Sequence, residues 1–198
     1  EEEFLAQVEK AGVAVVEQTA ALAPADKKIY ALRDVTATVD SIPLIASSIL
    51  SKKLAAGTHT IVLDVKVGAG AFMKTQEDAV NLAQTMVKIG TSQGRKMAAL
   101  LTDMDAPLGY AVGNALEMKE AISVLRGKEK GELRILCLAL ATEMLSLAEN
   151  IPEKEAAELV KSALDDGRAY EKMKEWIAVQ GGDPAYIECP SLFPESSV

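Results

Sequence analysis

Apolar residues recur along this chain in two patterns, as short continuous runs and as helically spaced stripes. The runs lie at residues 13–19, 58–70 and 95–104 and have the length of strands. Between the second and third runs, a helical stripe follows Thr75 and Asp78, which suit a helix N-cap. The stripe consists of Ala79, Leu82, Met86 and Ile89. The pattern predicts a strand–helix–strand crossover.

Apolar strands joined by helices of this length favour a mostly parallel sheet buried on both faces. The expected fold class is therefore α/β, with helices flanking the sheet. From Asn114 onward the apolar spacing is helical: Asn114 with Glu117 is expected to cap a helix, and Gly127 to end it. Residues 131–150 are predicted to form a nearly buried helix, and two more helices are expected to follow.

The stretch before the second apolar run is predicted to form two helices, because Pro24 and Pro43 break it. Ser41 suits an N-cap, so the second of these helices should cover residues 42–55. Within it, Ser48 and Lys52 are one turn apart on the same face.

Arg33, from the preceding helix, reaches this polar face if the two helices meet at an angle. A guanidinium, a hydroxyl and an ammonium all donate hydrogen bonds, which suits a planar ligand rich in carbonyl oxygens. The alternative is that these side chains form ordinary solvated helix faces, and spacing alone leaves both interpretations open.

Composition narrows the possible partners. The 198 residues carry a formal charge of -8 and only 4% aromatic side chains, which argues against a general nucleic-acid surface. The 2 cysteines have neither zinc-site spacing nor a disulfide pattern, and no apolar stretch is long enough for a bilayer. We therefore expect a cytoplasmic protein with no nucleic-acid and no membrane partner.

Three long motifs carry a specific resemblance. Residues 23–57 (APADKKIYALRDVTATVDSIPLIASSILSKKLAAG), 62–74 (VLDVKVGAGAFMK) and 103–117 (DMDAPLGYAVGNALE) resemble the pyrimidine-nucleoside phosphorylases and thymidine phosphorylases. The last motif is more similar to the broad-specificity bacterial pyrimidine enzymes. The similarity continues over nearly the whole chain.

The resemblance implies reversible phosphorolysis of a pyrimidine nucleoside such as uridine, thymidine or deoxyuridine. Phosphate attacks C1 of the sugar, giving (deoxy)ribose 1-phosphate and the free base. The matching motif positions assign base binding to Arg33, Ser48 and Lys52. Arg33 and Lys52 are also expected to act in catalysis by stabilising the leaving base.

The resemblance also implies a potassium ion and no organic cofactor. Its ligands would include the backbone carbonyls of Leu108 and Ala111 and the carboxylate of Glu120, because hard oxygen donors suit a hard cation. The other ligands of this family site belong to a segment that the matched residues do not contain. The site is therefore expected to be partial in this chain.

The family's phosphate-binding segment and active-site histidine lie upstream of the matched region, so no phosphate ligand is assigned here. The chain has no initiator methionine and opens inside a helical pattern, which indicates a piece of a longer protein that is inactive alone. Family members are homodimers of two lobes. The implied division is 1–23 (α/β lobe), 24–55 (helical lobe with the base pocket) and 56–198 (α/β lobe).

Two further features have weaker assignments. His59 does not match the catalytic histidine and is expected at the surface, while the G-A-G at residues 68–70 is expected to form a tight turn rather than a phosphate cradle. Two alternatives remain open. One is an anthranilate-type phosphoribosyltransferase, which uses pyrophosphorylated ribose with magnesium, and the other is a non-catalytic pyrimidine-binding fragment.

Overall fold

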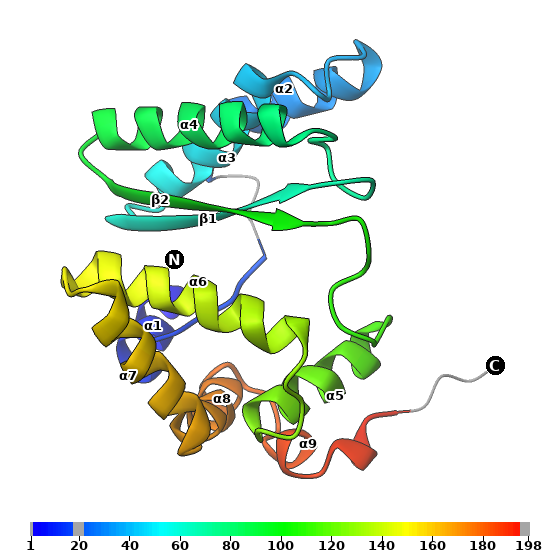
Figure 1. The fold of residues 1–198 in the computed structure, drawn as a ribbon, viewed down its shortest axis with the longest axis vertical. Coiled ribbons are helices and arrows are strands. Elements are labelled where there is room, and N and C mark those ends of the chain that lie inside the picture. The colour runs from blue at the N-terminus through cyan, green and yellow to red at the C-terminus, as the bar shows by residue number, and fades with distance from the viewer. Residues whose placement is uncertain (1, 18–21, 195–198) are drawn as a thin grey trace. The chain divides into compact units, whose positions relative to one another are not determined.

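A computed structural model describes residues 2–17 and 22–194. The elements in chain order are α1 (Glu2–Ala11), α2 (Pro24–Val35), α3 (Ile42–Ala55), β1 (Thr60–Val67), α4 (Gln76–Ser92), β2 (Lys96–Asp103), α5 (Asn114–Leu125), α6 (Glu132–Glu149), α7 (Glu153–Asp165), α8 (Arg168–Val179), α9 (Ala185–Glu188) and the 3-10 turn η1 (Pro190–Leu192). They form two compact units (Figure 1). Unit 1 comprises Glu1–Glu17, Gly109–Leu138 and Ala157–Val198, and unit 2 comprises Gln18–Leu108 and Ala139–Ala156.

The sheet of unit 2 confirms the predicted crossover and the α/β class. β1 and β2 pair in parallel, in register from Thr60 opposite Lys96 to Val67 opposite Asp103, and α4 connects them. α3 and α4 pack together on one side of this sheet (Figure 1). At the start of α4 the predicted cap is present, since the Thr75 hydroxyl accepts a hydrogen bond from the Asp78 amide at 3.1 Å.

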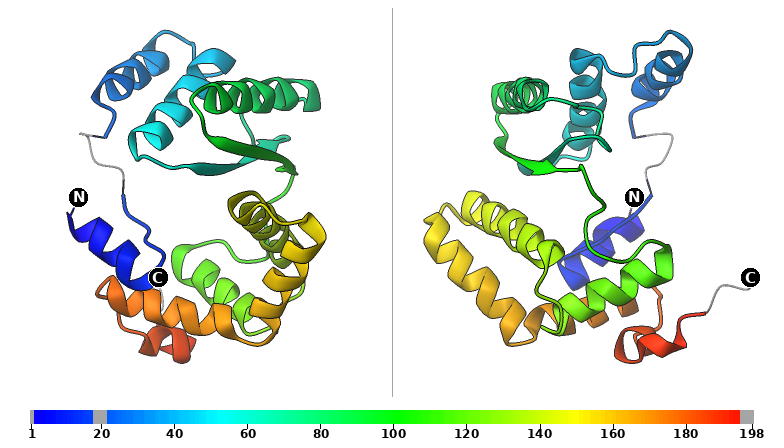
Figure 2. Two further views of the ribbon diagram at one scale, coloured as in Figure 1. Left: turned by 90° about the vertical axis from the view of Figure 1, so that its left-hand side faces the viewer. Right: turned by 45° about the vertical axis from the view of Figure 1, so that its right-hand side comes forward.

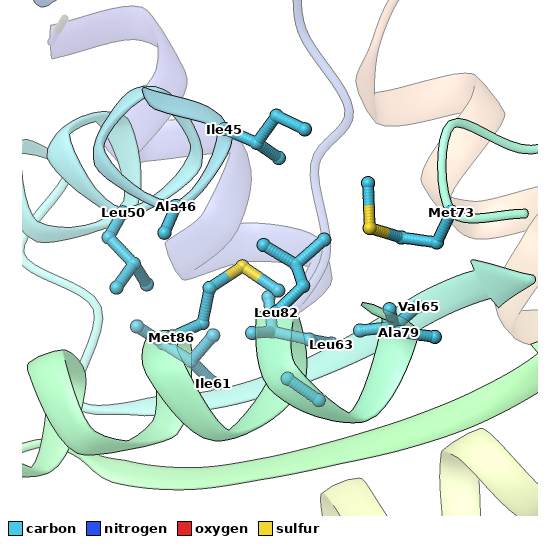
Figure 3. Close-up of a cluster of buried hydrophobic side chains, with 11 residues drawn as sticks. Ile45, Ala46, Leu50, Ile61, Leu63, Val65, Met73, Ala79, Leu82 and Met86 are labelled. Carbon is cyan, nitrogen blue, oxygen red and sulfur yellow. The ribbon is translucent and has the colours of Figure 1, made fainter. Parts of the chain in front are cut away.

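The core of unit 2 lies between the sheet and these two helices, where side chains of α3, β1 and α4 converge (Figure 3). Its buried members are Ile45, Ala46, Leu50, Ile61, Leu63, Val65, Met73, Ala79, Leu82, Ala83 and Met86. Alternate residues of β1 point into it, as the period of a strand requires. This packing fixes the position of α3, the helix that carries Ser48 and Lys52.

The prediction that both faces of the sheet are buried is wrong. β2 has no buried residue, and the second face of β1 includes the exposed Asp64. α3 and α4 cover one face only. At the start of β2, Lys96 Nζ donates to the Leu147 carbonyl at 3.1 Å.

α2 and α3 form the helical pair expected from the two proline breaks, and they lie side by side (Figure 2). α3 covers Ile42–Ala55, as predicted, with Ser41 at the N-cap position and Pro43 in the first turn. The Ser41 side chain makes no capping hydrogen bond. The short connection includes Ala37, whose positive φ of 54° turns the chain sharply between the helices.

Unit 1 is helical, with a smaller core formed by Ile122, Met173 and Ile187. Arg126 connects α5 to the C-terminal elements: its Nη2 donates to Tyr170 Oη at 2.8 Å and to the Ile187 carbonyl at 2.9 Å. α1 packs beside α8 in the same unit (Figure 2).

Three details of the sequence prediction are wrong. Residues 13–17 are not a strand, because Val15 exchanges its backbone hydrogen bonds with the Gln180 side chain, at 2.9 and 2.8 Å, instead of with another strand. Residues 18–19 of that prediction lie outside the described residues. α6 is not nearly buried: of its residues, all of them described, only Thr142 is buried. The N-cap of α5 is Gly113, with φ of 122°, rather than Asn114.

No helix within the described ranges is both long and apolar enough to span a bilayer.

Candidate functional site

Two facing helical stripes form a cluster of charged and hydroxyl side chains in unit 2. Asp26, Tyr30 and Arg33 recur on one face of α2 at the spacing of successive turns. Ser48 and Lys52 lie one turn apart on α3. Because α2 and α3 pack against each other, the structure brings the three predicted base-binding residues into one neighbourhood. We call these five residues the donor cluster.

Lys52 is the centre of the donor cluster. Its Nζ lies 3.2 Å from Ser48 Oγ and 3.1 Å from Asp26 Oδ2, and 5.9 Å from the centre of the Tyr30 ring. The side chains of Lys52 and Asp26 are 28% and 9% exposed, so the ion pair is partly shielded from water. The ammonium is therefore held in a defined place, while part of the Lys52 side chain stays accessible.

Arg33 is the second cation of the cluster and is only 5% exposed. Its Nη2 donates to the Val39 carbonyl, and its Cζ lies 5.3 Å from the centre of the Tyr30 ring. Its Nε is buried and has no hydrogen-bond acceptor within the described part of the chain. A buried donor without an acceptor costs about 1–3 kcal/mol, so this guanidinium keeps donor capacity that a ligand could use after a small rearrangement.

Lys53 does not belong to the donor cluster. It lines a separate hollow on unit 2 together with Thr58, Val62 and Met144. The helical spacing chose Lys52 as the partner of Ser48, and Lys52 is the lysine that contacts it.

Sequence reasoning missed Asp26 and Tyr30, although both carried a readable signal. They precede Arg33 by two turns and by one turn of the same helix, and therefore share its face. Their importance depends on Lys52, which comes from another helix, and no spacing within one helix reveals such a partner.

Of the predicted potassium ligands, Ala111 and Glu120 belong to unit 1, and Leu108 belongs to unit 2. The Glu120 carboxylate accepts hydrogen bonds from the amides of Tyr110 at 2.8 Å and Ala111 at 3.1 Å. Leu108 is exposed. A carboxylate oxygen that accepts one amide hydrogen bond keeps a further lone pair, so the donor set suits a hard cation. The assignment of Leu108, Ala111 and Glu120 to potassium stays a prediction.

Gly109 is the residue that lets this loop close on Glu120. Its φ is 77°, and a Cβ there would lie 2.6 Å from one Glu120 carboxylate oxygen and 2.7 Å from the other. We predict that Gly109→Ala destabilises the chain more than Gly127→Ala, by about 1–3 kcal/mol. Gly127 is a matched control, because its φ is 70° and its Cβ would meet nothing within 4 Å.

Urea unfolding of both variants and of the unchanged chain measures the difference in the free energy of unfolding. Equal losses for the two glycines would show that the contact with Glu120 does not constrain the loop.

The glycine-rich turn at residues 68–70 is packed against the segment that follows β2. The Ala69 amide donates to Asp105 Oδ1 at 2.7 Å, and a Cβ on Gly68 would lie 2.6 Å from the same oxygen. The helix that follows is capped by Thr75. This agrees with the expected tight turn, since an amide that already has a carboxylate acceptor is not offered to phosphate. His59 is exposed, as expected.

No group of three or more His, Cys, Asp or Glu side chains is placed to hold a metal ion in residues 2–17 and 22–194.

Together, the parallel crossover and the donor cluster define an α/β protein with charged and hydroxyl side chains gathered between α2 and α3. By sequence, the chain belongs to the glycosyl transferase family with an a/b domain, whose family profile matches residues 1–170.

Curated relatives support a more specific similarity. The chain is 53% identical over 196 residues to the pyrimidine-nucleoside phosphorylase of Geobacillus stearothermophilus. The matched residues make up 98% of this chain and 45% of that protein. It is 51% identical over 197 residues to the enzyme of the same name from Bacillus subtilis. This match makes up 99% of this chain and 46% of the Bacillus subtilis enzyme. The resemblance seen in the motifs is thus confirmed, and the chain spans about half the length of the curated relatives it matches.

Proposed function

We propose that this chain forms the pyrimidine-binding part of a pyrimidine-nucleoside phosphorylase. The observation that carries this proposal is the convergence of Arg33, Ser48 and Lys52 on one site between α2 and α3. The curated relatives of the same name, about half identical to this chain, support it. We use "full-length protein" below for a chain of the relatives' length that contains these residues.

In the proposed reaction, a phosphate oxygen forms a bond to C1 of the sugar as the bond from C1 to the base nitrogen breaks. The electron pair of the broken bond moves onto the base, whose carbonyl oxygens gain negative charge. Donors from Arg33 and Lys52 stabilise this charge more strongly in the transition state than in the bound nucleoside, which lowers the barrier. Ser48 fixes the orientation of the ring by a hydrogen bond. We assign no phosphate ligand to the described residues.

The reaction class is tested by incubating the full-length protein with uridine and measuring uracil and ribose 1-phosphate. We expect equal amounts of both products, and no uracil when phosphate is omitted. Uracil released without phosphate would indicate a hydrolase instead. Conversion that needs pyrophosphorylated ribose and magnesium would support the anthranilate-type alternative, and no conversion at all would support a binding role. A parallel assay with thymidine compares the two nucleosides.

Potassium is proposed as the cation of the loop that Glu120 closes. We predict that potassium raises the activity or thermal stability of the full-length protein relative to sodium. Glu120→Gln should blunt this response, because a neutral amide is a poorer ligand for a cation.

Glu120 also accepts two backbone hydrogen bonds, so its replacement can weaken the loop without any cation. Glu117→Gln, an exposed position on the same helix, controls for the loss of charge. A full-length protein that is indifferent to potassium would remove the cation from the proposal.

The homodimer and the cytoplasmic location implied by the family are also proposals. Sedimentation equilibrium of the full-length protein tests the first of them.

A further inference from the structure

We propose that Asp26 is a positioning residue that aims the Lys52 ammonium at the substrate base, an inference that rests on the proposed function. Asp26 lies in the first turn of α2, and its carboxylate is 3.1 Å from Lys52 Nζ. The Asp26 side chain is 9% exposed, so it faces the cluster rather than the solvent.

A lysine ammonium has three N–H donors and no acceptor. In the donor cluster, Asp26 and Ser48 each lie within hydrogen-bond or ion-pair distance of Lys52 Nζ. Ser48 accepts one of these donors, and Asp26 holds the same ammonium as an ion pair. The two contacts together restrict the position of the ammonium and the directions left for donation to a carbonyl oxygen of the base.

The same arrangement orients Ser48. Its hydroxyl oxygen accepts from Lys52 at 3.2 Å, so its own hydrogen is free to donate elsewhere. Asp26 therefore sets two donors of the pocket at once, although it touches neither the base nor the sugar in this proposal.

Asp26 has two opposing effects on the rate. Its negative charge weakens the attraction between Lys52 and the leaving base, whereas its contact removes freedom from a long, flexible side chain. We expect positioning to dominate, because a misplacement of about 1 Å in an active site can cost about 10²-fold in rate. A faster enzyme after loss of the Asp26 charge would therefore contradict the proposal.

A purely structural role is the alternative to exclude. An acidic residue in the first turn stabilises a helix through the helix dipole, and Asp26 occupies such a position in α2. That role predicts a loss of stability without any effect specific to Lys52. The experiment must therefore report on Lys52 itself.

The first readout needs no enzymatic activity. The chain and its Asp26→Asn and Asp40→Asn variants are labelled with trace acetic anhydride, and mass spectrometry compares acetylation of Lys52 with that of Lys53. We expect Asp26→Asn to raise the ratio by about two- to fivefold, because without this partly exposed ion pair the Lys52 side chain is unpaired for a larger fraction of the time. Asp40, exposed in the turn before α3, should leave it unchanged. An unchanged ratio in folded Asp26→Asn overturns the proposal.

The second readout is kinetic and uses the full-length protein with saturating phosphate. We expect Asp26→Asn to lower kcat for uridine by about tenfold with a smaller change in KM, because the lost alignment matters most in the transition state. Asp26→Glu keeps the charge and should retain more of the rate, which also guards against a variant that fails to fold. A kcat for Asp26→Asn equal to that of Asp40→Asn overturns the proposal.

The two readouts separate the failure of this inference from the failure of the proposed function. If the unchanged full-length protein does not release uracil, the proposed function fails and the labelling ratio alone shows whether Asp26 holds Lys52. If that protein is active, the kinetics of Asp26→Asn decide the positioning role.

Discussion

Replacing Lys52 with alanine in the full-length protein should lower the turnover of uridine by about 10²-fold or more. The expected size is that of removing one donor from a site where negative charge develops in the transition state. Both kcat and kcat/KM should fall, because the interaction strengthens as the bond to the base breaks. Steady-state assays with saturating phosphate measure the effect.

Lys53→Ala is the matched control, since it removes the same side chain from the next position of the same helix. Lys53 lines a different hollow and should change turnover by less than about threefold. Similar losses for Lys52→Ala and Lys53→Ala would mean that the donor cluster is not the base site.

The chain of 198 residues alone should show no phosphorolysis of uridine or thymidine at any phosphate concentration. It contains Arg33, Ser48 and Lys52, but no phosphate ligand is assigned to its described residues. Positioning two reactants can supply roughly 7–11 kcal/mol of a barrier, so a chain that binds only the base should have no detectable rate.

This second prediction is measured as release of uracil by the purified chain beside the full-length protein. Activity in the chain that disappears in Lys52→Ala would show that the chain contains a working phosphate site. The proposal that it binds only the base would then be wrong. Activity that survives Lys52→Ala would indicate a contaminating enzyme.

Much of the local structure could be predicted from the sequence because its causes are local. The start of α3 follows from Pro43 in its first turn. The crossover from β1 through α4 to β2 follows from apolar periodicity and the cap at Thr75. The choice of Lys52 over Lys53 also needs only the geometry of one helix.

The failures concern burial and pairing, which depend on neighbours. Residues 13–17 have strand composition, yet Val15 bonds to the Gln180 side chain instead of another strand. α6 is apolar in sequence but largely uncovered within the described residues. Asp26 was overlooked because its partner Lys52 lies on a different helix, and the angle between two helices is a property of tertiary packing.

For the loop at residues 108–111, the sequence motif named Glu120 as a potassium ligand through resemblance only. The hydrogen bonds from the amides of Tyr110 and Ala111 to its carboxylate give Glu120 a second role, in closing the loop. A Cβ at Gly109 would meet those carboxylate oxygens, and its φ of 77° also favours glycine. Such a contact between a backbone turn and a side chain of the following helix leaves no periodic pattern in the sequence.

The central claim, that the donor cluster holds the pyrimidine base, is tested most directly by a crystal structure of the full-length protein with bound uracil. We expect a planar ring with its oxygens within hydrogen-bond distance of Arg33 and Lys52, and with Ser48 Oγ at its edge. The Lys52 ammonium should still contact Asp26. Uracil bound elsewhere, with Lys52 and Arg33 making no contact to it, would contradict the claim.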